Sequence, residues 1–299
     1  MLTGEEVWCQ MFSEPGSGSD LANLSTRAER DGDIYRVNGQ KIWTSGAHNS
    51  QFGILIARTN PDAKKQNGIS YFICPTDLPG IEMRPIIDMT TTHSFNEVFF
   101  TDVEIPVENL VGEENEGWRL AKVTLSNERV SLSTGGVLWG MGPTTEDLID
   151  LVRSNGGCDD RLMRQRLADL YIEGQVLDLI RQRTLMARLA GKQPGTEASI
   201  RKILADEHGQ KVMALAKDLG GASGMLEGSV PESGGRTRST KGEGMWHWGY
   251  LFSQALTIGG GTGEVQRNIL GERVLGLPKE PNVEKGLTWR ESQRSHSAG

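Results

Sequence analysis

The sequence predicts an α+β protein in which a small β-barrel or β-sandwich is followed by a helical bundle. Three observations support this fold class. Short apolar or alternating runs separated by turn residues occupy the first third of the chain, the hydrophobic period becomes helical from Trp118 onward, and further apolar helical stripes recur after it. We therefore expect a β-domain over residues 1–112, a helical domain over residues 113–280 and a polar tail over residues 281–299.

The β-domain is predicted from strands that turn residues separate at short intervals, as in small barrels and sandwiches. The alternating run 34–37 meets Asn38-Gly39, a dipeptide that favours a two-residue hairpin, and the return strand is expected at 41–44. Further strands are expected at residues 52–58, 69–74, 81–86 and 96–105. The stretch before them, residues 8–20, begins with strand chemistry and becomes a loop rich in glycine and small hydroxyl side chains.

The helical domain is predicted from apolar residues that recur at spacings of three and four. Helices are expected at about residues 118–142, 163–189, 197–219, 247–258 and from 263 onward. Gly220-Gly221 provides a suitable C-cap for the third of these helices. The stretch 227–244 is rich in glycine, serine and charged residues, and we expect it and the tail from Pro278 to be poorly ordered.

Composition excludes several classes of function. The 299 residues carry 32 Lys+Arg against 39 Asp+Glu, a net charge of -7, which argues against nucleic acid as the main partner. Cys9, Cys74 and Cys158 are far apart and lack metal-ligand spacing, so we expect neither a disulfide framework nor a metal site. No apolar run reaches the length of a membrane span, and the acidic start is unlike a signal peptide. We expect a soluble, cytoplasmic protein.

A run of three glycines, ending with Gly260-Gly261 before Thr262, interrupts the helical pattern. Glycines at such a break let the backbone approach a ligand, and N–H groups at the next helix start can bind an anion or a carbonyl oxygen. The run is also compatible with a plain helix break capped by Thr262. The loop after Phe12 leaves the same choice between a site for a flat ring or thioester and a solvent-exposed turn.

Four separated motifs lie in one order along the chain. They read Phe12-Ser13-Glu14-Pro15-Gly16-Ser17-Gly18-Ser19-Asp20, Gly39-Gln40-Lys41-Ile42-Trp43-Thr44-Ser45-Gly46, Asp218-Leu219-Gly220-Gly221 and Gly260-Gly261-Thr262-Gly263-Glu264-Val265-Gln266-Arg267. Together they resemble the acyl-CoA dehydrogenase family, which oxidises acyl-CoA thioesters with FAD, over about residues 3–278. The resemblance implies a middle β-domain and a C-terminal four-helix bundle without the family's N-terminal helical domain. We therefore expect a fragment, a misplaced start or a partner chain that supplies the missing wall.

The resemblance also implies the catalytic groups. The reaction needs a base at Cα of the thioester and donors for its oxygen. Many members carry the base one place before a Gly-Thr pair, where this chain has Gly260. In a branch that resembles isovaleryl-CoA and long-chain acyl-CoA dehydrogenases, the base is a Glu directly before an Arg, as in Glu128-Arg129. We expect Glu128 as base, the Gly260 N–H as oxygen donor and Arg129 near the substrate. The alternatives are a solvated Glu128 and an Arg129 that pairs with it inside the helix.

Other residues match the family's cofactor and substrate positions by motif. The motifs place Phe12, Ser13, Trp43 and Ser45 (or Thr44) at the flavin ring, Ser19 near the pantetheine arm, and Gly221, Thr262 and Glu264 along the rest of FAD. Trp43 is also compatible with a core position. Arg153 and Gln165 match positions that reach the FAD of a neighbouring subunit, although the Phe expected beside the Arg is missing.

The resemblance supports an FAD-dependent acyl-CoA dehydrogenase that forms a trans-2-enoyl-CoA, passes electrons to an electron-transfer flavoprotein, and assembles as a homo- or hetero-oligomer (dimer or tetramer). The missing Phe, and Lys217-Asp218 where the family has a Gln before the double Gly, also allow a second hypothesis, a non-catalytic or half-site subunit that completes the FAD site of a heteromeric enzyme. An oxidase of the same fold is a third possibility. Leu132, Gly135 and Gly136 shape the acyl pocket by the resemblance, and the small residues among them predict room for a bulky or long acyl group, including a branched or ring-bearing one.

Overall fold

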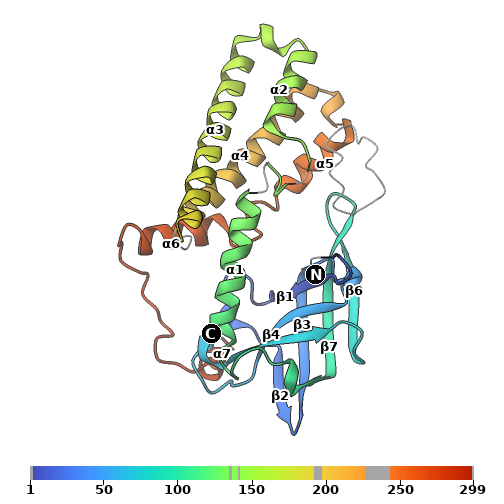
Figure 1. Ribbon diagram of the computed structural model, residues 1–299, viewed down its shortest axis with the longest axis vertical. Coiled ribbons are helices and arrows are strands. Elements are labelled where there is room, and N and C mark those ends of the chain that lie inside the picture. The colour runs from blue at the N-terminus through green and yellow to red at the C-terminus, as the bar shows by residue number, and fades with distance from the viewer. Residues whose placement is uncertain (1–2, 135–136, 141, 192–196, 226–242, 298–299) are drawn as a thin grey trace. The chain divides into compact units, whose positions relative to one another are not determined.

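The computed structural model describes residues 3–134, 137–140, 142–191, 197–225 and 243–297. The chain divides into two compact units: unit 1 comprises Met1–Thr124 and Glu280–Gly299, and unit 2 comprises Leu125–Lys279 (Figure 1). Each unit has its own cluster of buried apolar side chains. None of the helices within the described ranges combines the length and the apolar character that a bilayer crossing requires.

Unit 1 is built on one curled sheet of seven strands (Figure 1). The strands are β1 (Trp8–Met11), β2 (Arg27–Asp31), β3 (Ile34–Ser45), β4 (Phe52–Arg58), β5 (Ile69–Pro75), β6 (Ile81–Ile87) and β7 (His93–Pro106). Hydrogen-bonded neighbours follow the order β1-β4-β2-β3-β7-β6, and β5 pairs with β4. β1 and β2 run parallel to β4, whereas the other pairs are antiparallel. The curled sheet confirms the predicted β-domain.

The dipeptide Asn38-Gly39 does not form the predicted hairpin. Strand β3 continues through it, and Gly39 lies beside a β-bulge in the pairing with β7. Gly39 has a φ of 152°, and a Cβ there would stand 2.5 Å from Thr26 Oγ1, so the close approach of β3 to the residue that precedes β2 requires this glycine. The turn lies instead between β2 and β3, where Gly32 has a φ of 60°.

The helices that precede the tail are α1 (Gly117–Thr134), α2 (Thr145–Ser154), α3 (Arg161–Leu189), α4 (Glu197–Gly220), α5 (Glu243–Ser253) and α6 (Gly263–Arg273). The bounds of α3, α4 and α6 agree with the sequence prediction, whereas α2 was not predicted. Helix α1 ends before residue 142 because Trp139, Gly140 and Gly142 have positive φ angles, which a right-handed helix does not contain. Helix α5 ends at Ser253 rather than 258. Most of the stretch 227–244 lies outside the described residues.

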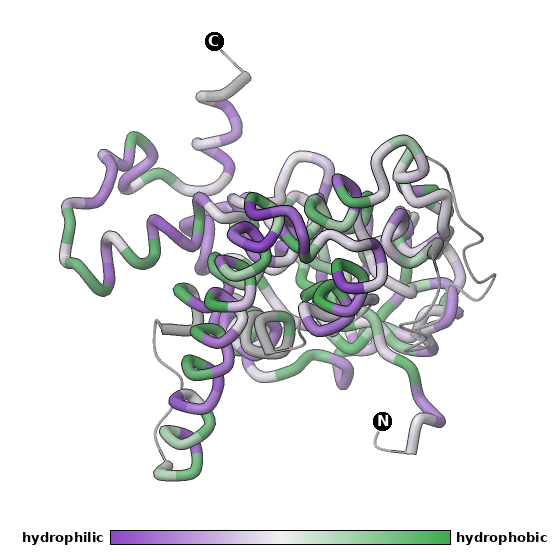
Figure 2. Tube along the Cα trace, turned by 90° about the horizontal axis from the view of Figure 1, so that it is seen from above, coloured by the Kyte–Doolittle hydropathy of each residue, from purple (hydrophilic) through white to green (hydrophobic). Residues whose placement is uncertain are grey.

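Helix α4 lies at the centre of unit 2 and packs against α2, α3, α5 and α6. Its buried residues Val212, Met213 and Leu215 join Leu148 and Val152 of α2 in one apolar cluster. Apolar and polar residues alternate along the helical segments of the trace (Figure 2). The packing around α4 follows from this amphipathic pattern, because an amphipathic helix buries its apolar stripe against its neighbours.

Helix α3 exposes many apolar side chains. Among its described residues only Leu170 is buried. The exposed apolar residues of α3 are Leu162, Tyr171, Ile172, Val176, Leu179, Leu185, Met186 and Leu189. An apolar surface of this extent is typical of a face that packs against another protein chain.

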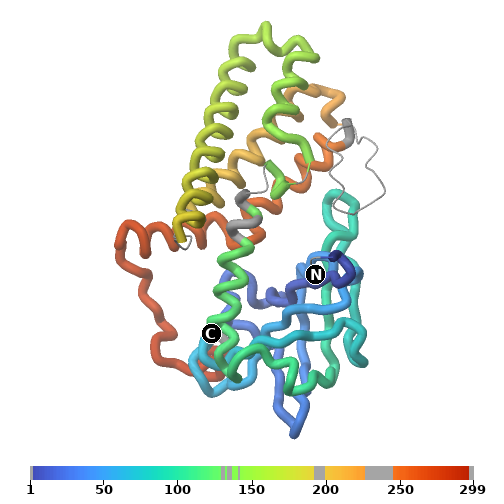
Figure 3. Tube along the Cα trace, viewed as in Figure 1, coloured from blue at the N-terminus to red at the C-terminus, as the bar shows by residue number. Residues whose placement is uncertain are grey.

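The C-terminal tail is ordered and belongs to unit 1, which corrects the prediction of poor order (Figure 3). It forms helix α7 (Trp289–Ser297). The Arg58 guanidinium lies over the Trp289 ring, 4.7 Å from its centroid, and Trp289 Nε1 donates to the carbonyl of Asn23 at 3.2 Å. Arg290 pairs with Asp62 at 2.8 Å. The polar tail is therefore held by the contacts of one aromatic side chain, Trp289, and by the neighbouring ion pair of Arg290 with Asp62.

Candidate functional site

The glycine run forms a tight turn before α6. Gly260 has a φ of 66° and Gly261 a φ of 91°, and Thr262 caps α6 by accepting a hydrogen bond from the N–H of Val265 at 3.3 Å. The turn therefore contains the N-cap that the sequence left open as an alternative. Both φ angles lie in the left-handed region, which glycine adopts without a steric cost.

The turn brings Gly260 next to Glu128 of α1, far from it in sequence. A Cβ on Gly260 would stand 3.8 Å from Glu128 Oε1, 3.1 Å from Lys202 Cε and 2.6 Å from Leu132 Cδ1. A carboxylate side chain at this position, which the resemblance implies for many members, would require Leu132 and Lys202 to move. A carboxylate from α1 lies beside it instead, which is the arrangement that the motif comparison predicted for the two residues.

The backbone N–H of Gly260 donates no hydrogen bond within the described part of the chain. Its neighbour Gly259 donates to the carbonyl of Ala255 at 2.9 Å. On the other side, Gln266 Nε2 donates to the carbonyls of Gly260 and Gly261 at 3.4 and 3.5 Å. The carbonyls of the turn are thus held, while the N–H of Gly260 is left for another acceptor.

A buried ion pair on α4 lies against this turn, and sequence reasoning missed it. Lys202 is completely buried, and its Nζ pairs with Asp206 and donates to the carbonyl of Leu256 at 2.9 Å. Trp139 Nε1 donates to Asp206 at 3.4 Å. Burial raises the pKa of Asp206 to about 6, although Lys202 and Trp139 act in the opposite direction. The available signal was a Lys and an Asp four places apart on an apolar helix face.

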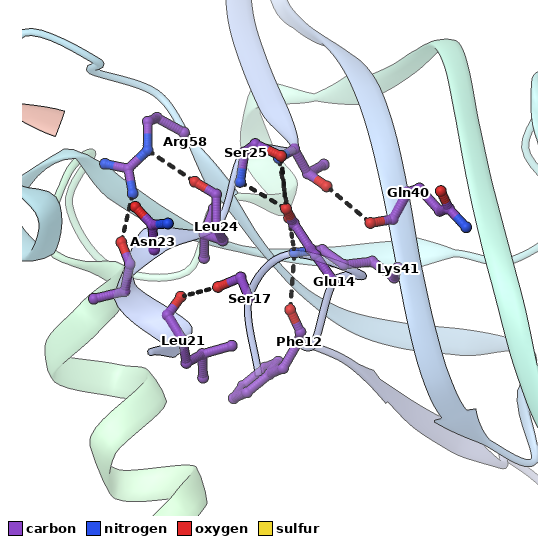
Figure 4. A network of polar contacts seen from close by, with 12 residues as sticks. Phe12, Glu14, Ser17, Leu21, Asn23, Leu24, Ser25, Gln40, Lys41 and Arg58 are labelled. Carbon is purple, nitrogen blue, oxygen red and sulfur yellow. Dashed lines mark hydrogen bonds and ion pairs between the residues drawn. The ribbon is translucent and has the colours of Figure 1, made fainter. Parts of the chain in front are cut away.

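In unit 1, the loop after β1 is fixed by a second buried ion pair (Figure 4). Lys41 Nζ lies 2.7 Å from Glu14 Oε1 and donates to the carbonyl of Phe12 at 3.0 Å. Glu14 also accepts hydrogen bonds from the N–H of Ser25 at 2.6 Å and of Thr26 at 3.0 Å. Burial alone would raise the pKa of Glu14, but the ion pair with Lys41 and the hydrogen bonds together lower it. Glu14 and Lys41 lie within two of the motifs, yet no role was predicted for them.

The loop is also joined to β3, because the N–H of Ile42 donates to the carbonyl of Ser13 at 2.9 Å. One residue further, Trp43 has a φ of 58° and lies in a β-bulge between Lys41 and Thr44. The bulge leaves Trp43 57% exposed. Trp43 is therefore not a residue of the apolar core of unit 1, which was the alternative. A non-glycine residue with positive φ stores strain, which is typical of functional positions.

The residues around Trp43 fit a planar polar ligand such as a flavin ring. The exposed indole offers an aromatic face, and the Ser45 beside it is exposed. The hydroxyl of Thr44 is buried and has no hydrogen-bond partner among the described residues, an uncommon state for a buried polar atom. Phe12 is buried and contacts Tyr71 edge to face. Ser19, the predicted acyl-CoA contact, is exposed in the same unit.

The remaining predicted residues lie on the surface of unit 2. Glu264 lines a pocket of about 260 Å³ together with Ile203, Asp206, Glu207, Gln210, Thr257, Gly263 and Arg267. Gly221 follows α4 with a φ of 48°. Arg153 pairs with Asp150 at 3.4 Å and Gln165 donates to Asp169 at 3.4 Å, each within its own helix. The side chain of Arg129 lies outside the described residues.

Comparison with known families finds two matches that together cover most of the chain. "Acyl-CoA dehydrogenase, middle domain" matches residues 9–103, and "Acyl-CoA dehydrogenase, C-terminal domain" matches residues 115–275. Among curated proteins, acyl-CoA dehydrogenase IpdE1 of Mycobacterium tuberculosis is 40% identical over 277 residues, which are 92% of this chain and 68% of that protein. Acyl-CoA dehydrogenase FadE34 of the same organism is 37% identical over 279 residues, 93% of this chain but only 36% of FadE34.

Solved structures give the same result. The Tcur3481-Tcur3483 steroid ACAD superposes with a TM-score of 0.81 at 32% identity, over 93% of this chain and 70% of that one. The ChsE4-ChsE5 complex from Mycobacterium tuberculosis superposes with a TM-score of 0.77 at 34% identity, over 92% of this chain and 70% of that one. The similarity thus extends over both units and not over the motifs alone.

Proposed function

Because the chain belongs to the acyl-CoA dehydrogenase family, we propose that it provides the catalytic base of an FAD-dependent enzyme that converts an acyl-CoA thioester to the trans-2-enoyl-CoA. The observation that carries the proposal is the Glu128 carboxylate beside the backbone of Gly260. Proton removal next to a thioester carbonyl requires a base near Cα and an N–H donor near the thioester oxygen.

In this mechanism Glu128 accepts the proton from Cα of the acyl group. The negative charge that develops moves to the thioester oxygen, where the N–H of Gly260 donates a hydrogen bond. Within the described residues this N–H donates to no other group, and Gln266 holds the carbonyls of Gly260 and Gly261 that follow it; both observations support this role. A bound FAD supplies the acceptor for the hydride that leaves Cβ. An electron-transfer flavoprotein is the electron acceptor that we expect.

Residues of both motifs in unit 1 would hold the flavin. Trp43 would cover part of the ring, and the hydroxyls of Ser13, Thr44 and Ser45 would donate to its polar edge. The exposed indole and the unpaired Thr44 hydroxyl support this assignment. Thr262, Glu264 and Gly221 are proposed for the remainder of this FAD, and Arg153 and Gln165 for contacts with the FAD of a neighbouring subunit. Phe12 contributes its backbone amide.

The acyl group that we propose is bulky and contains rings. The solved Tcur3481-Tcur3483 protein is described as a steroid ACAD, and it is similar to this chain over both units. The side chain of Leu132 lies next to Gly260, on the same side as the Glu128 carboxylate. Ser19 and Arg129 are proposed to contact the acyl-CoA.

A heteromeric assembly is the second candidate. Two of the similar structures contain two named components each, Tcur3481 with Tcur3483 and ChsE4 with ChsE5. The exposed apolar side chains of α3 support association with a further chain. In that case this chain supplies Glu128 and part of the FAD site, and a partner supplies the rest.

The test is the visible spectrum of the complete protein during addition of steroid-like and linear acyl-CoAs, with Glu128→Gln beside the wild type. We expect the flavin absorbance to bleach in the wild type, and the rate to fall about 10²- to 10⁴-fold in Glu128→Gln, the usual effect of a lost general base. Glu146→Gln, an exposed glutamate on α2, is the matched control and should react as the wild type does.

Three other results would each change the proposal. Equal bleaching in Glu128→Gln means that another group is the base. A colourless protein that acquires flavin only with a second chain supports the heteromeric candidate. Rapid oxygen consumption without an added electron acceptor indicates an oxidase.

A further inference from the structure

The ion pair of Lys202 and Asp206 has no role in the proposed chemistry, although it lies directly behind the Gly260 turn. Both side chains are almost completely inaccessible to solvent, at 0% and 3% exposure. A buried ion pair is weak evidence for stability, because removing two charges from water offsets most of their attraction. A pair in this position therefore calls for an explanation other than stability.

Lys202 contacts the turn at two places. Its Nζ donates to the carbonyl of Leu256 at 2.9 Å, four residues before Gly260. Its Cε fills the space where a side chain at position 260 would begin, 3.1 Å from that point. The lysine thus holds the start of the turn by a charged hydrogen bond and supports its end by packing.

Asp206 and Trp139 complete the cluster. Asp206 lies one helical turn after Lys202 on α4, and it fixes the direction of the ammonium group. Trp139 donates its Nε1–H to Asp206 at 3.4 Å, while its ring occupies the space beside Gly259, 2.7 Å from where a Cβ would stand. Trp139, which donates to the ion pair, therefore also limits the position of the Gly259 backbone.

We propose that the Lys202–Asp206 pair is a positioning element, which fixes the turn 256–260 so that the N–H of Gly260 stands beside the Glu128 carboxylate. The inference rests on the proposed function for its catalytic consequence. Its structural part, the fixing of the turn, is independent of any reaction.

The test uses the double variant Lys202→Met/Asp206→Asn in the complete protein. Methionine retains most of the lysine stem, and asparagine retains an acceptor for Trp139, so no single buried charge is left. The matched control is Lys279→Met/Glu272→Gln, which removes an ion pair with a lysine that is 76% exposed and a glutamate that is 31% exposed.

The first measurement is amide hydrogen exchange of the segment 254–261, which requires neither flavin nor substrate. We expect exchange at least about tenfold faster in the double variant than in the control. Unchanged exchange in this segment overturns the proposal, whatever reaction the protein catalyses.

The second measurement separates positioning from mere structural support. Acetoacetyl-CoA loses an acidic α-proton to give an enolate with negative charge on the thioester oxygen. The fraction of bound ligand present as the enolate therefore measures how well the Gly260 N–H stabilises that charge. We expect the wild type to bind acetoacetyl-CoA largely as the enolate. In the double variant, the enolisation equilibrium of the bound ligand should shift by about tenfold toward the neutral form. For turnover of an acyl-CoA substrate by the same variant, kcat should fall about 10- to 100-fold while KM changes less than about threefold. Faster exchange with an unchanged enolate fraction overturns the proposal.

Two further outcomes are distinguishable. If the wild type neither enolises acetoacetyl-CoA nor reduces its flavin, the proposed function fails, while faster exchange in the variant still supports the fixed turn. If the double variant does not fold, Trp139→Phe replaces it. That substitution removes the hydrogen bond to Asp206 and replaces the indole beside Gly259 with a smaller ring, so a shift of the enolate fraction in the same direction is expected, and no shift overturns the proposal.

Discussion

The carboxylate of Glu128 lies 3.8 Å, at its Oε1 atom, from the point that a Cβ on Gly260 would occupy. The two residues come from the first helix of the bundle and from the turn before α6, and both belong to unit 2. A side chain at position 260 would therefore stand next to the Glu128 carboxylate. This relationship determines what substitutions at either position are expected to do.

Gly260→Ala should destabilise the protein by about 2 to 4 kcal/mol, because a methyl group would meet Leu132 at 2.6 Å and the backbone would remain at a φ of 66°. Gly156→Ala is the matched control, since Gly156 has a φ of 71° but nothing within 4 Å of its Cβ position. The control should cost only the backbone strain, about 1 to 2 kcal/mol. Urea unfolding of both variants checks the difference, and equal costs would show that the steric contact is relieved.

Glu14→Gln should cost about 3 to 5 kcal/mol, because it leaves the fully buried Lys41 ammonium without its carboxylate. The double variant Glu14→Gln/Lys41→Met should cost less than the single variant, since no uncompensated charge remains. Glu29→Gln, whose partner Arg27 is on the surface, should change stability by less than about 1 kcal/mol. A double variant that is less stable than Glu14→Gln would contradict this account of the pair.

Trp43→Gly should leave the unfolding free energy within about 1 kcal/mol of the wild type, because the lost side chain is exposed and glycine adopts a positive φ freely. The same substitution should weaken flavin retention by about tenfold or more, the effect of losing an aromatic stacking face. Trp43→Phe retains such a face and should bind flavin more tightly than Trp43→Gly. Flavin titration of the apoprotein gives the comparison, and full retention in Trp43→Gly would remove Trp43 from the cofactor site.

Asp206 should make stability fall as pH rises from about 4 to about 6. Burial raises its folded pKa from 3.8 to about 6, so in this window the folded state binds the proton more tightly than the unfolded state. The unfolding free energy of the wild type relative to Asp206→Asn should therefore decrease by about 2 to 3 kcal/mol across the window. Chemical unfolding at a series of pH values measures this difference, and parallel curves for the two proteins would show that Asp206 does not titrate there.

Sequence patterns predicted most of the elements. The apolar periodicity of α3 and α4 gave their bounds, and the N-cap role of Thr262 was one of the two alternatives for the glycine run, because such features depend on neighbours in the chain. Two local predictions were wrong for tertiary reasons. The pairing of β3 with β7 made Asn38-Gly39 a bulge instead of a turn, and contacts of Trp289 with Arg58 and Asn23 ordered a tail of polar composition.

The sequence by itself determined the family, the order of the two kinds of domain and the identity of Glu128 as a candidate base, because motifs and periodicity are written in consecutive residues. Only the tertiary structure decided that Glu128 meets Gly260, and that Lys202 and Asp206 are buried behind the turn. No periodicity relates residues on separate helices, since their approach depends on how side chains pack between the helices. The burial of a charge likewise depends on every neighbour that excludes water from it.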